Sequence, residues 1–534
     1  MQIEVLTDMR KIIIGIDAGT TMIKAVAFSL EGDTVCKSSV RNTVKRPEPG
    51  WTEQSMVTTW KKTVQTISEV IDQLDRSDEI LAVGVTGQGD GCWLIEADGT
   101  PARSAILWSD GRASDRVTKW QDEGITERIY DICGGTQFTG SSLVILGWLR
   151  EHEPETYEKI DTVFFCKDWL KYNLTDELTT DLSDGSLPYV DVETGEYADE
   201  VLDIVEMPEV APMRPSLAAG TEIIGEITRD ASVETGLPPG TPVVSGFIDV
   251  AASAFGSGAA LSGDGSSVVG TTSVSQMILD EPVLGDQQAG ITLTLGIGDG
   301  LWTQFMASMT GTPNLDWAIE EIMDKSDFNL VEEAVESIPI GSDGVLYHPF
   351  LSSAGERAPF VNPNARAQFM GLTQEHTQAH LVRAVYEGIS LAMRDCYAHL
   401  PYETENIYLS GGGANSSFWC QMFADCLNAT IIVPEGSEFG AKGAALLAGV
   451  GVDAYADLPS AVEQTSSVEK SFEPQPEKVR QYRRWYDVYR EAYEATFEIW
   501  DQRTQALRDL RDMEESSSHQ STKKSVTGKD TVGE

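Results

Sequence analysis

The sequence opens on an apolar run that ends in an aspartate and a small, hydroxyl-rich turn. Residues 13–24 read IIGIDAGTTMIK, in which Asp17 precedes Ala, Gly and two Thr before a second apolar run begins. An apolar run bounded by a glycine turn predicts a buried strand that enters a hairpin. Glycine lets the backbone approach a ligand closely, and successive amides and hydroxyls can donate to phosphate oxygens. The stretch therefore predicts either a phosphate-binding hairpin or a plain hairpin with a polar turn.

Three later glycine-marked loops also follow predicted strands, at residues 88–91, 270–273 and 411–415. The run 241–248 leads to Asp249 much as the first strand leads to Asp17, which weakly indicates a duplicated architecture. In layered α/β proteins, ligands gather at the carboxyl ends of strands. Two hydroxyl-rich hairpins from two halves then suggest a nucleoside triphosphate held across a cleft. The loop 411–415, which opens a helix, suits a nucleoside or a phosphate approached by the backbone. Neither a Walker A motif nor a GxGxxG fingerprint followed by an acidic residue is present.

The chain has 534 residues, which predicts more than one domain. We expect an N-terminal domain at 1–240, a C-terminal domain at 241–470, a helix within 471–513 and a disordered tail at 514–534. The helical segment has an aromatic stripe that is typical of a helix packed on the body of the protein. The last residues are rich in Ser, Thr, Lys and Glu, with almost no apolar side chains.

Charge and cysteine content exclude several classes of protein. The net charge is −45, from 84 acidic and 39 basic residues, so the surface repels nucleic acid and anionic membranes. The simplest hypothesis is adaptation to a very salty cytoplasm, where screening is nearly complete. Seven cysteines without a CxxC pair argue against structural zinc and a disulfide framework. No apolar run approaches the ~20 residues of a membrane helix, and the start lacks a signal-peptide pattern, so we expect a cytoplasmic location.

The motifs resemble those of the FGGY carbohydrate kinases, within the actin-like ATPase superfamily. Residues 367–372 (AQFMGL), seven further residues and then 380–387 (HLVRAVYE) satisfy the second signature of that family at every restricted position. Blocks at 355–359, 411–415 and 440–445 are also similar. The first signature departs from the pattern, because Ile145 replaces a lysine three residues before Trp148. The resemblance implies an α/β fold of two ribonuclease-H-like, actin-like ATPase domains with a cleft between them.

The resemblance implies ATP-dependent phosphorylation of a sugar or polyol, with Mg²⁺ held by Asp17 and Asp249. It implies that Asp249 is the catalytic base, whereas the sequence alone favours a helix N-cap there, since Val250 opens a predicted helix. The residues that it implies for ATP binding are Asp17, Gly19, Thr20, Thr21, Lys24, Gly270, Thr271, Thr272, Gly411, Gly412 and Asn415.

The implied acceptor site consists, with Asp249, of Gln88, Asp90, Trp108, Asp110 and Arg112. Carboxylates accept hydrogen bonds from vicinal hydroxyls, and an indole face packs against sugar C–H groups. The alternatives are core packing for Trp108 and a surface ion pair for Asp110 and Arg112. The loop 88–91 reads Gln-Gly-Asp-Gly, where xylulokinases typically have Gln-Met-His-Gly and glycerol kinases an Arg-Glu pair. It looks closer to erythritol or L-xylulose-type kinases, which favours a four- or five-carbon polyol or ketose.

Three alternatives remain open from the sequence. An actin-like or chaperone-like ATPase switch would hydrolyse ATP without a sugar, although the acceptor-like residues argue against it. A glycerol kinase of the same family would use a smaller polyol, and a sugar-binding regulator would have lost catalysis. The expected partner is a small sugar or polyol, without nucleic acid or membrane, and a homodimer is possible.

Overall fold

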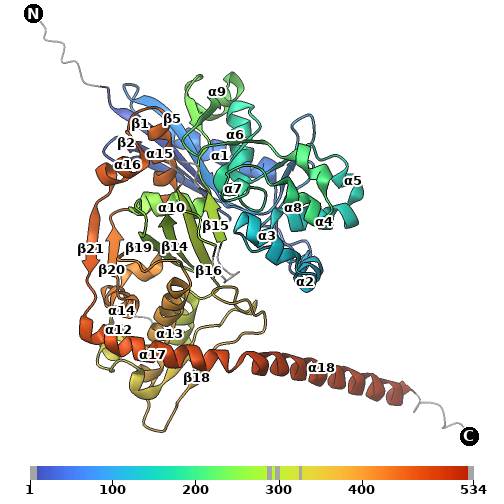
Figure 1. The fold of residues 1–534 in the computed structure, drawn as a ribbon, viewed down its shortest axis with the longest axis vertical. Helices are drawn as coiled ribbons and strands as arrows, with labels where there is room; N and C mark the ends of the chain where they lie inside the picture. The colour runs from blue at the N-terminus through green and yellow to red at the C-terminus, as the bar shows by residue number, and fades with distance from the viewer. Residues whose placement is uncertain (1–8, 285–290, 295–300, 324–327, 527–534) are drawn as a thin grey trace, which may run out of the picture.

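Two large mixed β-sheets, one in each half of the chain, organise the computed structural model (Figure 1). The structure describes residues 9–284, 291–294, 301–323 and 328–526. The first sheet has the order β11 (Ile223–Glu226), β12 (Pro242–Val244), β5 (Glu79–Gly87), β1 (Lys11–Ala18), β2 (Met22–Ser29) and β3 (Thr34–Arg41). The second has the order β15 (Ile291–Thr294), β16 (Trp302–Ser308), β14 (Ser273–Leu279), β13 (Gly265–Val269), β19 (Asn406–Ser410), β20 (Thr430–Pro434) and β21 (Val468–Phe472).

The two sheets repeat one arrangement of five strands. In the first, β1 pairs antiparallel with β2 and β2 with β3, while β5 runs parallel to β1 and β12 parallel to β5. In the second, β13 pairs antiparallel with β14 and β14 with β16, while β19 runs parallel to β13 and β20 parallel to β19. The expected duplication of an α/β architecture is confirmed by this common strand order.

The apolar run of β1 is buried on both faces, as is typical of a strand covered by helices on each side. Ile13 belongs to a core with Ala445 and Leu447 of α15 (Phe439–Gly451), whereas Ile14 faces a core with residues of α1 (Met56–Ile71). The helix α15 comes from the second half of the chain, yet it packs on the first sheet. A Cβ at Gly15 would lie 1.8 Å from the carbonyl oxygen of Ala441, so only glycine permits this approach.

The strand β12 corrects the expected domain division at residue 240. Residues 242–244 follow that division, but they pair with β5 and β11 in the first sheet. The sequence pattern cannot identify this, because a short apolar strand does not reveal which sheet it joins. A division between α10 (Asp249–Ser257) and β13 keeps both sheets whole.

The remaining helices cover the sheets and build the outer part of the first half (Figure 1). They are α2 (Ser114–Asp122), α3 (Ile125–Cys133), α4 (Ser142–His152), α5 (Pro154–Tyr157), α6 (Cys166–Thr175), α7 (Leu182–Gly185), α8 (Asp199–Ile204), α9 (Arg229–Thr235), α11 (Pro313–Ala318), α12 (Phe328–Glu336), α13 (Gln378–Ala398), α14 (Ser417–Leu427) and α16 (Leu458–Thr465). Within the described ranges, four short strand pairs complete the fold: β4 (Glu53–Gln54) with β7 (Ala105–Ile106), β6 (Trp93–Ile95) with β8 (Thr162–Phe164), β9 (Thr179–Asp181) with β10 (Ser216–Ala218), and β17 (Leu346–His348) with β18 (Gln368–Met370).

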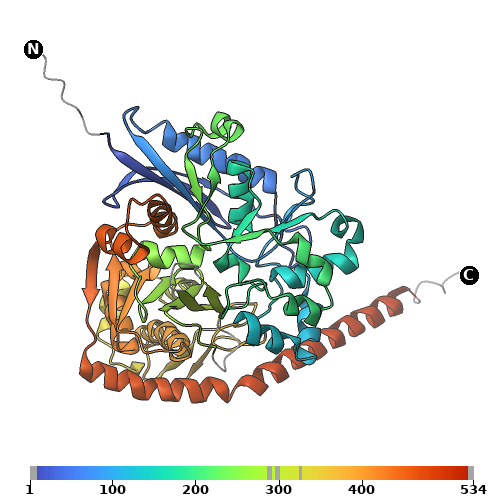
Figure 2. The same ribbon diagram turned by 45° about the horizontal axis from the view of Figure 1, so that its top comes forward.

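The C-terminal helical segment differs from its prediction in two ways. It consists of two helices, α17 (Pro476–Glu494) and α18 (Phe497–Val526), and the second extends away from the body (Figure 2). The aromatic stripe packs on the body as expected, with Tyr482 and Tyr489 buried. The tail predicted to be disordered from residue 514 is helical to Val526, in keeping with the helix propensity of Met and Glu where it starts. Residues 527–534 lie outside the described part of the chain.

In the described ranges, none of the helices is both long and apolar enough to cross a bilayer.

Candidate active site

Three aspartates meet where the central strands of the first sheet end. Asp17 of β1 pairs with Thr86 of β5, so the strand ends lie side by side. The loop after β5 carries Asp90, and Gly87 forms a bridge with Ile248, the residue before Asp249. A Cβ at residue 89 would lie 2.0 Å from Cδ1 of Ile248, so the loop packs tightly on that turn. Parallel strand ends thus bring Asp17, Asp90 and Asp249 together, as the sequence predicts.

Burial raises the pKa values of all three carboxyl groups, and a neighbouring carboxylate adds to each rise: Glu438 for Asp17, Asp17 for Asp249 and Asp249 for Asp90. Burial raises the pKa of Asp17 to about 6, against the lowering effect of Lys24. Burial and then the charge of Asp17 raise the pKa of Asp249 to about 7, while the N–H of Val250 lowers it. Burial raises the pKa of Asp90 to about 8, and Arg357 opposes this rise. Such a cluster of raised values indicates a functional site.

The donor set would fit a hard divalent cation such as Mg²⁺, bound mainly through water. Asp17 and Asp249 are carboxylates that repel each other, so a divalent cation between them would be favoured. No group of three or more His, Cys, Asp or Glu side chains suited to a metal occurs within the described ranges. Mg²⁺ commonly uses one or two carboxylates and retains several waters, so two acidic groups are sufficient.

Asp17 is held by residues from both halves of the chain. Its cross-strand neighbour Lys24 forms an ion pair with Glu438 (2.9 Å), just before α15. The first turn of α15 lies against the carboxylate, because a Cβ at Gly440 would be 2.8 Å from Oδ2 of Asp17. The N-terminus of a helix attracts negative charge, so α15 helps to hold the ionised form of Asp17. The amine of Lys24 is therefore paired with Glu438, and its charge also stabilises the ionised form of Asp17.

A hydrogen-bonded network joins the first hairpin to the predicted acceptor residues. The hydroxyl of Thr20 donates to Oε1 of Gln88 (2.7 Å) and accepts from Nε1 of Trp108 (3.1 Å). Gln54 donates to the carbonyl of Thr20 (2.6 Å) and accepts from Nε2 of Gln88 (2.8 Å). Trp108 is half-buried with its indole N–H used in this network, so it is not a residue of the apolar core. The neighbouring Thr21 is exposed.

Asp110 and Arg112 form a buried ion pair, which corrects the surface alternative. Nε of Arg112 lies 2.8 Å from Oδ1 of Asp110, and both side chains are fully buried. The other carboxylate oxygen accepts from the amide of Thr52 (2.6 Å), and Arg112 also donates to Glu53 (2.8 Å). These bonds fix residues 52–54, and Gln54 in turn bonds Gln88, so the ion pair helps to position a predicted acceptor residue.

The second glycine-rich hairpin lies in the other half, where three loops converge. The amide of Thr312 donates to the carbonyl of Gly270 (2.7 Å), and a Cβ at Gly411 would lie 2.5 Å from the carbonyl of Val269. The amide of Gly270 donates to the carbonyl of Thr272 (3.0 Å), which closes the hairpin. The residues at this edge that are exposed to solvent are Thr271, Gly411, Gly412 and Asn415. Exposed backbone and hydroxyl groups at strand ends suit phosphate and nucleoside contacts.

Sequence reasoning missed three groups that surround the site. Gln54 holds Gln88, and Arg357 lies near Trp108, with its Cζ 5.2 Å from the ring centre. Behind the loop 87–90, Lys167 forms ion pairs with Asp168, Asp181 and Asp184, all fully buried. Only Arg357 had a sequence signal, because it belongs to the motif 355–359. The other groups act through contacts between distant segments, which a local pattern does not contain.

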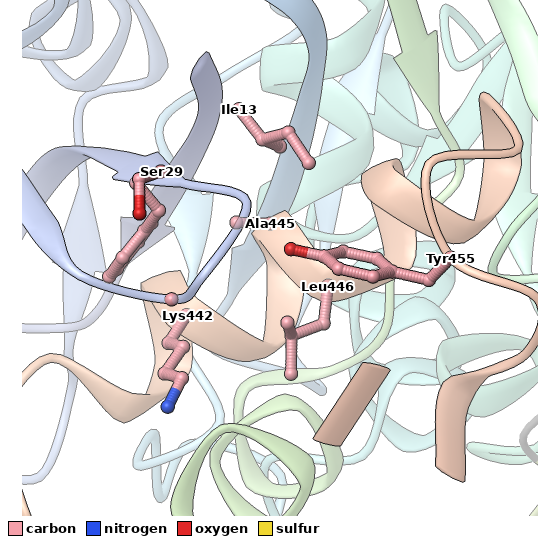
Figure 3. Close-up of a pocket in the computed structure, with 8 residues that line it drawn as sticks. Ile13, Ser29, Lys442, Ala445, Leu446 and Tyr455 are labelled. Atoms are coloured by element: carbon pink, nitrogen blue, oxygen red, sulfur yellow. The ribbon is translucent and has the colours of Figure 1, made fainter. Parts of the chain in front are cut away.

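A small cavity lies elsewhere, between the first hairpin and α15, and it does not belong to this site. Its lining includes Ile13, Ala445, Leu446 and Tyr455, and it has no room for a water molecule (Figure 3). The amine of Lys442 at its edge donates to the carbonyl of Thr465 (2.7 Å). The cavity is therefore a packing feature rather than a ligand site.

Comparisons with known proteins show which families, relatives and solved structures this chain is similar to. Residues 12–256 match the model of the N-terminal domain of the FGGY family of carbohydrate kinases, and residues 265–452 match that of its C-terminal domain. An erythritol kinase of Brucella abortus is 32% identical, over 92% of this chain and 97% of its own length. A probable L-xylulose kinase of Pasteurella multocida is 31% identical, over 93% and 99%. The crystal structure of a gluconate kinase from Lactobacillus acidophilus has a TM-score of 0.87 at 24% identity, covers 92% and 99%, and supports the fold.

Proposed function

Because the chain belongs to the FGGY family of carbohydrate kinases, we propose that it transfers the γ-phosphoryl group of ATP to a hydroxyl of a four- or five-carbon polyol or ketose. Membership of this family makes the protein a phosphotransferase. The observation that carries the proposal is the convergence of Asp17, Asp90 and Asp249 beside the Thr20–Gln88 network.

Asp249 acts as the base in this proposal. A sugar hydroxyl is a poor acid, so a positioned carboxylate must orient it and accept its proton as the bond to the γ-phosphorus forms. The raised pKa of about 7 keeps Asp249 basic enough to accept a proton near neutral pH. Asp249 is the first residue of α10 and follows the N-cap residue Ile248, so it is not the N-cap that the sequence alone favours. The N–H of Val250 still donates to its carboxylate, which leaves the carboxylate available for the role of base.

The phosphates of ATP bind between the two glycine-rich hairpins. Gly19, Thr20 and Thr21 supply donors from the first half, and Gly270, Thr271 and Thr272 supply them from the second. The exposed edge of Gly411, Gly412 and Asn415 borders the adenosine. Lys24 acts indirectly, since its ion pair with Glu438 holds α15 near Asp17. Asp17 and Asp249 would hold Mg²⁺, which would neutralise charge on the phosphates during transfer.

The acceptor lies against Gln88, Asp90 and Trp108. The amide and carboxyl groups bond hydroxyls, and the indole face packs on C–H groups. Asp110 and Arg112 support these residues from behind through Thr52 and Glu53. The names of the two relatives, erythritol kinase and probable L-xylulose kinase, support an acceptor of four or five carbons for this chain too.

The cellular setting follows from composition. ATP and a phosphorylated sugar are intracellular metabolites, so we place the protein in the cytoplasm. The net charge of −45 supports a cytoplasm of high ionic strength, where self-repulsion is screened. Activity and stability should then be higher in molar KCl than in dilute buffer, and equal values in both would contradict the salt adaptation.

The test is a coupled ADP-release assay in molar KCl with Mg²⁺ and ATP. The panel contains ketopentoses, tetritols, pentitols, hexuloses and glycerol. One strongly preferred acceptor of four or five carbons would support the proposal and name the substrate. A preference for glycerol would make the protein a glycerol kinase of the same family. ADP release that ignores every acceptor would instead support an ATPase switch and overturn the acceptor site.

A further inference from the structure

The loop that carries Arg357 is anchored firmly to the second sheet. The buried carboxylate of Glu356 accepts from the amide of Met309 (2.7 Å) and the hydroxyl of Thr310 (3.1 Å), just beyond β16. Arg357 itself donates from Nε to the carbonyl of Ala307 (3.0 Å). This hydrogen bond holds the base of the guanidinium against the end of β16.

The guanidinium of Arg357 reaches the predicted acceptor residues of the other half. Its Cζ lies 5.2 Å from the ring centre of Trp108, within the range of a cation–π contact. Its charge acts on Asp90 and opposes the rise that burial causes in the pKa of that carboxyl. Trp108 in turn bonds Thr20, so the cation lies beside the network that joins hairpin and acceptor residues.

The outer donors of Arg357 have no hydrogen-bond partner in the part of the chain that the structure describes. Among the described residues, no hydrogen bond involves either terminal nitrogen, and no direct ion pair joins Arg357 to Asp90. A guanidinium has five N–H donors and no acceptor, whereas the carboxyl group of Asp90 can accept a hydrogen bond in either protonation state. The two groups are therefore complementary in hydrogen bonding, and no direct bond joins them among the described residues. A hydroxyl can serve both at once, as a donor to one and an acceptor from the other.

We propose that Arg357 is an acceptor-binding residue contributed by the second half, and that one hydroxyl or carbonyl oxygen of the acceptor binds its terminal nitrogens opposite Asp90. The inference rests on the proposed function and adds to it the source of specificity. Because Arg357 and Asp90 belong to different halves, the bound acceptor links them. Acceptor binding is then coupled to the closed arrangement that excludes water from the γ-phosphate.

The test measures the KM for the preferred acceptor, the KM for ATP and the thermal midpoint in the full-length protein. Loss of a hydrogen bond to a charged group predicts that Arg357→Met raises the acceptor KM about 10- to 100-fold. The KM for ATP should change less than about twofold, since Arg357 faces the acceptor. The matched control is Arg366→Met in the same loop, where the arginine bonds the carbonyls of Pro363, Ala365 and Ser353. That variant should keep the acceptor KM of the parent.

Arg357→Lys covers the case in which the methionine variant does not fold. Lysine keeps the charge but loses the planar fork, so its acceptor KM should lie between those of the parent and Arg357→Met. An acceptor KM equal to that of the parent in the folded variant would overturn the proposal. An equal rise of both KM values would also overturn it, because that result indicates a general distortion.

Deoxy analogues of the acceptor separate a direct contact from an indirect one. For one analogue, the KM in the parent should rise by as much as the KM for the full acceptor rises in Arg357→Met. In that variant, the KM values of this analogue and of the full acceptor should be equal. Full additivity of the two losses for every analogue would overturn a direct contact. If the parent enzyme phosphorylates no acceptor at all, the proposed function itself fails, and that result is distinguishable from all of these.

Discussion

The carboxylate of Asp17 in the first half of the chain lies against Gly440 in the second half. The space at residue 440 accommodates the hydrogen of glycine but not the methyl group of alanine. A Cβ there would lie 2.8 Å from Oδ2 of Asp17 and 3.4 Å from Oγ of Ser253. Both neighbours are the far ends of side chains, so they can move without disturbing the backbone. The absence of a side chain at residue 440 therefore determines the position of the carboxylate.

Gly440→Ala is expected to lower kcat while the fold is kept. The added methyl displaces the Asp17 carboxylate, and a displacement of about 1 Å at a phosphoryl-transfer site can cost about 100-fold in rate. Steady-state kinetics and a thermal melt check this. The contrasting variant is Gly443→Ala, whose Cβ would lie 1.9 Å from the carbonyl of Ala252 and should destabilise the fold. Normal kcat in Gly440→Ala would show that Asp17 does not need this position.

Asp249→Ala should abolish phosphoryl transfer without loss of ATP binding. A positioned general base contributes about 10²- to 10⁴-fold, and alanine removes it. Single-turnover transfer and calorimetric titration of ATP measure the two effects separately. Asp264→Asn is the matched control. Asp264 is also a buried aspartate, but it accepts hydrogen bonds from the amides of Ala260 and Leu261 and has no proposed role in catalysis, so its substitution should leave phosphoryl transfer intact. Unchanged turnover in Asp249→Ala would rule out the assigned base.

Lys167→Met should destabilise the first half of the protein strongly. The amine of Lys167 lies 3.0 Å from Asp168, 2.5 Å from Asp181 and 2.5 Å from Asp184, with every side chain fully buried. Removal of the cation leaves Asp181 and Asp184 without this ion pair, although Asp168 keeps Lys171 (3.1 Å), and the loss of a buried partner typically costs about 3–5 kcal/mol. Urea unfolding at pH 7.5 measures the change in the free energy of unfolding.

The control for Lys167→Met is Lys119→Met on α2. Lys119 is exposed, and its nearest acidic partner, Glu123, lies 4.0 Å away on the same helix. Exposed pairs of this kind contribute little, so the control should change the free energy of unfolding by less than about 1 kcal/mol. Equal effects of the two substitutions would mean that the buried cluster is not the stabilising element described above.

The sequence predicted those parts of the site that are specified by local pattern. The run before Asp17 and the helix that starts at Asp249 both follow from apolar runs, glycine turns and cap residues close in sequence. The family resemblance then supplied roles that the pattern alone left open. The structure brings Asp17, Asp90 and Asp249 together, and their roles stay predictions.

The parts that the sequence could not predict depend on pairing between distant segments. Membership of β12 in the first sheet is set by its partner β5, about 160 residues away in the chain. Gln54 reaches Gln88 through a short strand pair, and Arg357 reaches Trp108 from the other half. The Asp110–Arg112 pair looks like a surface pair in sequence, but Trp51 (4.0 Å) and Trp148 (5.2 Å) pack over Arg112 and the pair is fully buried. Such tertiary contacts leave no local period.

His348 should make the stability of the second half depend on pH in a mildly acidic range. Burial lowers the pKa of His348 from its ordinary 6.5 to about 4. Its Nδ1 accepts from Nε2 of Gln368 (2.8 Å) and its Nε2 donates to the carbonyl of Tyr489 (3.1 Å), which is the arrangement of a neutral ring. The unfolded chain therefore binds a proton between about pH 6.5 and pH 4 that the folded chain does not bind. Stability from this group is complete above about pH 6.5 and is lost as the pH falls toward 4.

The expected loss between pH 7.5 and pH 5 from this one group is about 2 kcal/mol in the free energy of unfolding. Urea unfolding of the parent and of His348→Gln at both pH values, in the same molar KCl, isolates it from the many carboxylates. The variant should be less stable at pH 7.5 but should lose about 2 kcal/mol less on acidification. The exposed His152→Gln serves as the control and should retain the pH dependence of the parent. If His348→Gln and the parent lose equal stability between pH 7.5 and pH 5, His348 takes up its proton in the folded state. That result would contradict the assignment of a neutral imidazole with both nitrogens hydrogen-bonded between β17, β18 and α17.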